Sequence, residues 1–246
     1  MKELFQTQPI TWPVIAWLCV GITGIVVPVA AVIYFATTRD TPPWAFAGGP
    51  ILALALMGAG IIGSAAAGRI WTGVLLALAS AGTVTVLAST LASLPPINPL
   101  TLAIAMLIAS ISFAARGALF ARSMEGRGWW MALAVVAGEA AVVVTALADP
   151  EALPRWLLVF LPAQWATSAL QNALAGEGAF AASSALIALG GTAAATIIVT
   201  ALWPRRWTYV IMFTVWISLS ALVYHRPAPP VPSIDECVAG WQLNAP

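Results

Sequence analysis

Long runs of apolar residues fill most of the chain, and short polar segments separate them. A helix that crosses a bilayer needs about 20 apolar residues. Six runs reach or nearly reach this length, and a seventh is shorter but uncharged. The runs are residues 12–36, 44–67, 70–92, 100–120, 129–148, 178–203 and 207–224. The pattern predicts an all-α, polytopic helical membrane protein, with about seven transmembrane helices in residues 1–224 and a proline-rich extramembrane tail in residues 225–246.

Residues 155–174 interrupt this pattern, because they are apolar for only about a dozen positions and then become polar after Pro162. The segment can re-enter the membrane from the outer side, which brings amide and hydroxyl groups to membrane depth. It can also lie as an amphipathic helix in the outer headgroup region, with Trp156 and Trp165 as anchors. The sequence favours this interfacial helix. The polar groups concerned belong to Gln164, Thr167, Ser168, Gln171 and Asn172.

The basic residues test whether this segment crosses the membrane. With seven spans, seven of them fall on one side: Lys2, Arg69, Arg116, Arg122, Arg127, Arg205 and Arg206. The other three are Arg39, Arg155 and Arg226. An eighth span changes this division to six against four. The excess of basic residues on cytoplasmic loops favours seven spans in a cell (inner) membrane, with a cytoplasmic N-terminus and an outer C-terminal tail. Eight spans is the alternative.

Composition supports the membrane class, since 61% of the residues are hydrophobic and 8% are charged. Soluble domains carry about 25% charged residues. This shortfall argues against a soluble enzyme, a disordered chain and a secreted disulfide scaffold. The net charge of +1 gives no basic surface and therefore no nucleic-acid partner. The expected partners are the lipid bilayer and either other membrane subunits or further copies of this chain.

Small residues at helical spacing predict where helices approach each other closely. In the second run, Gly60, Ser64 and Gly68 share one face, which favours helix–helix packing. Pro28 predicts a kink in the first run, because proline removes a backbone hydrogen bond and crowds the preceding turn.

Glu139 lies near the middle of the fifth run, where a carboxyl group is costly and is by default a functional-site hypothesis. Matching depths across the short loop between the fourth and fifth runs places Ser110 level with Glu139, with Ser112 close by. Arg116 lies nearer the cytoplasmic end, from where it reaches part of the way or extends to the headgroups. Glu139 is then a protonated structural group bonded to Ser110 or a backbone carbonyl, a proton or cation relay, or the partner of another subunit.

Familiar catalytic motifs are lacking, and the only histidine is His225. We therefore expect no catalytic residues, no metal site and no cofactor. The favoured function is a non-catalytic multi-span subunit of a larger membrane complex. The alternative is a small transporter or permease with Glu139 on its pathway, and an intramembrane lipid-modifying enzyme is a weaker third. None of these hypotheses identifies a substrate.

One segment resembles a known family. Residues 153–170, which begin Leu153-Pro154-Arg155-Trp156, followed by the run 178–203, resemble the outer re-entrant segment and last helix of ABC-2-type exporter permeases. The resemblance covers about a fifth of the chain and implies a re-entrant segment here. The chain departs from that family in two ways. Only Gly68-Arg69 stands where the family has a charged coupling helix for its ATPase, and there is an additional seventh span.

Overall fold

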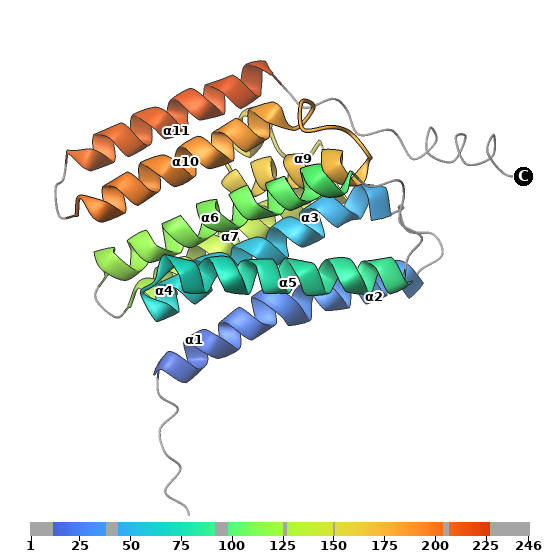
Figure 1. Ribbon diagram of the computed structural model, residues 1–246, viewed down its shortest axis with the longest axis horizontal. Helices are drawn as coiled ribbons and strands as arrows, with labels where there is room; N and C mark the ends of the chain where they lie inside the picture. The colour runs from blue at the N-terminus through green and yellow to red at the C-terminus, as the bar shows by residue number, and fades with distance from the viewer. Residues whose placement is uncertain are drawn as a thin grey trace, which may run out of the picture.

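A computed structural model describes residues 12–37, 44–91, 98–124, 127–149, 151–203 and 207–226, and within these ranges every regular element is helical (Figure 1). Seven helices are long and apolar enough to cross a membrane. This confirms the predicted number and is compatible with an integral membrane protein. The seven are Val14–Thr37, Ala47–Ala67, Ile70–Leu91, Pro99–Ser123, Gly128–Ala148, Ser183–Ala201 and Thr208–His225. The predicted tail lies almost wholly outside the described residues.

The first two of these helices are each composed of three labelled elements, because a π-helical turn interrupts both. The first contains α1 (Trp12–Gly21), η1 (Ile22–Val26) and α2 (Val27–Thr37). The second contains α3 (Trp44–Met57), η2 (Gly58–Ile62) and α4 (Gly63–Ala67). The turn η1 ends two residues before Pro28, the residue at which the sequence predicts a kink.

Single helices form the rest of the bundle, and two short helices lie between the fifth and sixth spans. These elements are α5 (Ile70–Leu91), α6 (Pro99–Ser123), α7 (Gly128–Ala148), α8 (Arg155–Val159), α9 (Pro162–Leu174), α10 (Ser183–Ala201) and α11 (Thr208–His225). Asn98 caps α6, since its side-chain oxygen accepts a hydrogen bond from the Thr101 N–H at 3.1 Å, and Pro99 fills the first helical position.

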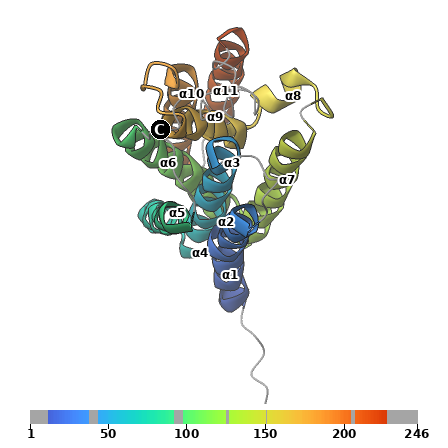
Figure 2. The same ribbon diagram turned by 90° about the vertical axis from the view of Figure 1, so that its right-hand side faces the viewer.

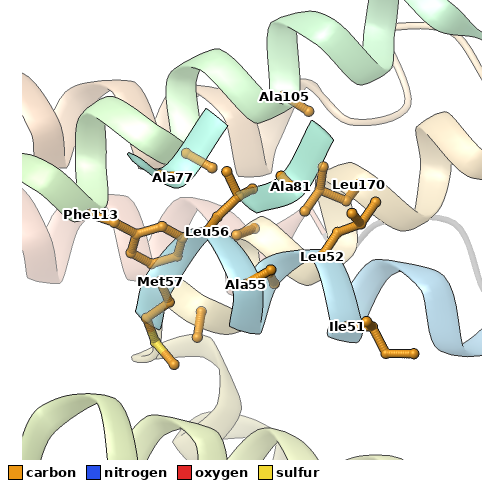
Figure 3. Close-up of a cluster of buried hydrophobic side chains, with 14 of the residues drawn as sticks. Ile51, Leu52, Ala55, Leu56, Met57, Ala77, Ala81, Ala105, Phe113 and Leu170 are labelled. Atoms are coloured by element: carbon orange, nitrogen blue, oxygen red, sulfur yellow. The ribbon is translucent and has the colours of Figure 1, made fainter. Parts of the chain in front are cut away.

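Helix α3 lies at the centre of the bundle, with the other helices around it (Figure 2). The second span, Ala47–Ala67, which contains most of α3, is 83% buried over its most apolar stretch, whereas the corresponding stretch of α11 is 11% buried. The core joins α3 to α5, α6 and α9 through Leu52, Leu56, Ala81, Phe113 and Leu170 (Figure 3). A short helix from outside the seven spans therefore contributes directly to the core.

Small residues on the second span pack closely, as the sequence predicts, but not all of them do so. A Cβ atom on Gly117 of α6 would overlap the Ile61 carbonyl and the Ser64 hydroxyl, so α6 touches the backbone of η2 and α4. Gly68 is different. It has φ 65° and ends α4 in the left-handed conformation, with open space where a side chain would be. Its predicted place on the packing face is therefore wrong.

Helix α9 is inside the bundle, where it packs against α3, α6 and α10. Trp165 is 1% exposed, and its indole N–H donates to the Val159 carbonyl at 2.8 Å, so it does not anchor α9 in a headgroup region. The favoured prediction of an interfacial helix is therefore wrong for α9. Of the two short helices α8 and α9, α8 is the one with an exposed tryptophan, Trp156.

The two ends of α9 lie at different depths along the bundle. The Ala163 N–H, in its first turn, contacts Glu139 in the middle of α7, whereas the Ala173 carbonyl accepts from the Asn98 N–H just before α6 at 3.1 Å. The chain thus enters the bundle after α7, turns near its middle and returns toward the end where α6 begins. This is the geometry of the re-entrant alternative.

Candidate functional site

An ion pair joins α6 to α7 in the interior of the bundle. Nη1 of Arg116 donates to Oε1 of Glu139 at 2.6 Å, and the two side chains are only 13% and 12% exposed. The Phe113 ring lies under the guanidinium, with its centroid 4.8 Å from Cζ of Arg116. Of the two positions that the sequence allows for Arg116, the structure has the inward one. Phe113 and Arg116 are three residues apart, so they share a helix face.

The second oxygen of Glu139 caps α9. Oε2 accepts a hydrogen bond from the Ala163 N–H at 3.1 Å. The residue before α9, Leu161, provides no side-chain hydrogen bond to the helix. The helix begins with Pro162, which has no N–H that needs an acceptor. A carboxylate from α7 therefore meets the positive end of the α9 dipole. The same side chain holds Arg116 and the deep end of α9.

Glu139 contacts neither Ser110 nor a backbone carbonyl, the two partners that the structural hypothesis gives it. Both carboxyl oxygens accept hydrogen bonds, one from the Arg116 guanidinium and one from the Ala163 N–H. Ser110 is buried but donates to the Leu107 carbonyl of its own helix at 2.8 Å. The partner that matters is Arg116, which depth matching alone placed too far away.

Further polar contacts hold the other turns of α9. Oε1 of Gln171 accepts from the Gly49 N–H of α3 at 3.0 Å, and both residues are buried. The Asn172 side chain donates to the Ala181 carbonyl at 3.4 Å. Gly49 has no room for a side chain, since a Cβ atom there would lie 2.8 Å from the Thr167 carbonyl. The sequence indicates the polar residues of α9, but no sequence pattern identifies Gly49 of α3 as the partner of Gln171.

Several buried polar atoms near the ion pair and along α9 have no hydrogen-bond partner among the described residues. They are Ser112 Oγ, Arg116 Nε and Nη2, Thr167 Oγ1 and Gln171 Nε2. Burying a polar group without a partner costs about 1–3 kcal/mol, and more for a charged group. Such atoms require a physical explanation, because native structures contain few of them. We define the polar centre as Ser112, Arg116, Glu139 and the first turn of α9.

The structure therefore brings together only part of the set of residues that the sequence indicates. Arg116 and Glu139 meet, and Ser112 is buried one helical turn from Arg116 on α6. Of the remaining candidates, Thr167 and Asn172 are buried in α9, whereas Gln164 and Ser168 are half-buried. Within the described ranges, no group of three or more His, Cys, Asp or Glu residues is placed to hold a metal ion.

The chain matches no protein-family model, no curated protein and no solved structure. The partial resemblance of residues 153–203 to exporter permeases gains no support from these comparisons. Statements about function therefore depend on the geometry of the bundle and its polar centre.

Proposed function

We propose that this integral membrane protein is a small transporter or permease, and that its pathway passes the polar centre. The observation that carries this proposal is the ion pair between Arg116 and Glu139 at the deep end of α9. Ionisable groups within spanning helices are costly, and in membrane proteins they mark substrate or ion pathways.

The form of α9 supports the same function. Transporters bind solutes where a helix is interrupted near the middle of the membrane, because the exposed helix end supplies unpaired backbone groups and a partial charge. Here the segment from α8 to α9 ends its inward course beside Glu139 and then returns. Irregular backbone at that depth is tolerated where protein or a water-filled cavity surrounds it.

Within this proposal, Glu139 positions other groups and does not relay protons. Its two oxygens are occupied by Arg116 and the Ala163 N–H, so it fixes both the guanidinium and the deep end of α9. Within the polar centre, the groups with unused hydrogen-bonding capacity belong to Ser112 and Arg116 of α6. These are the groups that face the pathway.

Transport by the purified chain in liposomes tests the proposal. The assay measures uptake of radiolabelled phosphate, acetate and rubidium, and inward movement of fluorescent phosphatidylglycerol. We expect protein-dependent movement of at least one solute class, and its loss in the double variant R116M/E139L. The matched control is R122K, because Arg122 is exposed on the same helix and contacts the Thr200 carbonyl. A double variant that is folded and fully active, or a wild-type protein that moves none of these solutes, overturns the proposal.

The second candidate is a non-catalytic subunit of a larger membrane complex, and α11 favours it. This helix packs on α10 and α8 only along one side, and it exposes large apolar side chains elsewhere. Examples are Val210, Phe213, Ile217 and Tyr224. Purification in a mild detergent separates the candidates. A stoichiometric protein partner that remains bound supports the subunit, and an isolated chain that transports solute supports the permease.

A further inference from the structure

The guanidinium of Arg116 uses only part of its hydrogen-bonding capacity. Nη1 donates to Glu139, whereas Nε and Nη2 are buried and have no partner among the described residues. The charge of Arg116 is balanced by Glu139, but these N–H groups are not satisfied by it. The contact with Glu139 therefore balances the charge of Arg116, and the Nε and Nη2 groups are left to recognise the geometry of a ligand.

Nε and Nη2 form one edge of the planar guanidinium, and their N–H bonds point in parallel. This edge matches two oxygens of one carboxylate or phosphate group, which bind it through two parallel hydrogen bonds. Neither a cation nor an uncharged apolar molecule satisfies two adjacent N–H donors. The chemistry of the unpaired edge therefore points to an oxyanion.

We propose that the Nε–Nη2 edge of Arg116 binds an oxyanion, a phosphate or carboxylate group of the transported molecule. The proposal rests on the transport function above and names its substrate class. The group can belong to a lipid headgroup or to a small solute, because both present the same pair of oxygens. Glu139 remains the positioning residue that holds the guanidinium in place.

The surroundings of Arg116 favour an anion. The deep end of α9 carries the positive end of the helix dipole and is hydrogen-bonded to the same Glu139 side chain that holds the guanidinium. Ser112 is buried one turn away on α6, and its hydroxyl has no partner among the described residues. Glu139 opposes this attraction, since its own negative charge occupies Nη1. The oxyanion and Glu139 thus compete for one guanidinium.

In this structure the edge is closed off from solvent, so binding requires the polar centre to open. Glu139 belongs to α7, and only 17% of the most apolar 18-residue stretch of this helix is buried. Arg116 belongs to α6, where 61% of the corresponding stretch is buried. Helix α7 therefore has a smaller share of its residues packed inside the bundle than α6. In this proposal, outward movement of α7 or of the deep end of α9 exposes the edge, while α6 keeps the backbone of Arg116 in place.

Thermal unfolding of the purified full-length chain tests this site. The first arm adds inorganic phosphate at constant ionic strength, with sodium chloride as the reference. The second compares nanodiscs of phosphatidylglycerol with nanodiscs of phosphatidylcholine. A bound anion stabilises the folded state by mass action, and we expect the midpoint to rise by about 2–4 °C once the anion exceeds its Kd severalfold. A rise in the first arm identifies a solute, and a rise only in the second identifies a lipid.

Two variants separate the site from a general salt effect. R116K keeps the positive charge but removes the planar edge, so the rise should disappear, whereas the control R122K should keep it. E139Q removes the competing charge and should lower the anion concentration needed for half of the effect by about tenfold, which is 1.4 kcal/mol. This second variant remains informative if R116K does not fold.

The outcomes are distinct for the site and for the transport function. No rise in either arm, an equal rise in R116K, or no change in affinity in E139Q overturns the oxyanion site. Transport of rubidium alone by a protein that shows no rise overturns the site and leaves the transport function intact. A rise that depends on Arg116, in a chain that moves no solute, supports the site and overturns the transport function.

Discussion

At the scale of single residues, the polar centre is defined by what Arg116 and Glu139 do for each other. Burying two charges is costly, and their attraction repays this cost only with good geometry and further hydrogen bonds. Glu139 has such a further bond, to the Ala163 N–H. Removing one partner leaves the other as a buried, uncompensated charge. Removing both side chains leaves no unpaired charge, and only the Ala163 N–H at the start of α9 loses its acceptor.

The first prediction follows from this difference. We expect the single variants R116M and E139L each to lower the free energy of unfolding by about 3–5 kcal/mol. The double variant R116M/E139L should lose less than either single variant, because no unpaired charge remains. Unfolding by dodecyl sulfate in mixed micelles, followed by tryptophan fluorescence, measures all three. Additive losses in the double variant would show that the two side chains are not coupled.

The second prediction concerns Gln171, which satisfies the backbone of another helix. Gln171→Leu leaves the buried Gly49 N–H without its side-chain acceptor and should cost about 1 kcal/mol. Gln164→Leu is the matched control, because Gln164 is half-buried on the same helix and should change stability by less. The same unfolding assay compares them. Equal effects of the two substitutions would contradict a specific role for the bond between Gln171 and Gly49.

At the scale of helices, hydropathy predicts the seven long elements but not the position of α9. Long apolar runs specify spanning helices by length alone, which a single sequence reveals directly. Helix α9 is short and carries Gln164, Thr167 and Ser168, a composition that also fits an interfacial helix. What decides between the two structures is contact with α3 and α7, at Gly49 and Glu139, and no local pattern encodes such partners.

The third prediction tests the close contact of α6 with η2 and α4. Gly117→Ala should destabilise the bundle by about 1–3 kcal/mol, because the added methyl group overlaps the backbone of Ile61 and the side chain of Ser64. The control is Gly138→Ala on α7, where nothing lies within 4 Å of the new atom. There the substitution should be neutral or slightly stabilising, since alanine favours helices. A Gly117→Ala variant as stable as the control would show that α6 and η2 are not tightly packed.

At the scale of the whole molecule, the number of spans decides on which sides the termini lie. Helix α1 begins at one end of the bundle and α11 ends at the other (Figure 1). The structure also changes how the charges are counted. Arg116 is paired within the bundle and does not mark a loop. Without it, six basic residues remain on the expected cytoplasmic side and three on the other side. The excess of basic residues on the expected cytoplasmic side therefore persists.

The fourth prediction is that residues after α11 face the outer side of the membrane. Alkaline phosphatase fused after Arg226 should be active, because this enzyme requires the oxidising outer compartment. Green fluorescent protein fused at the same place should be non-fluorescent. The reverse is expected after Gly68, which ends α4 on the same side as the start of α1. Green fluorescent protein that is fluorescent at both places would mean that residues 155–174 cross the membrane. The contact between Glu139 and Ala163 would then require a different arrangement, since α9 could not both cross and return to the end where α6 begins.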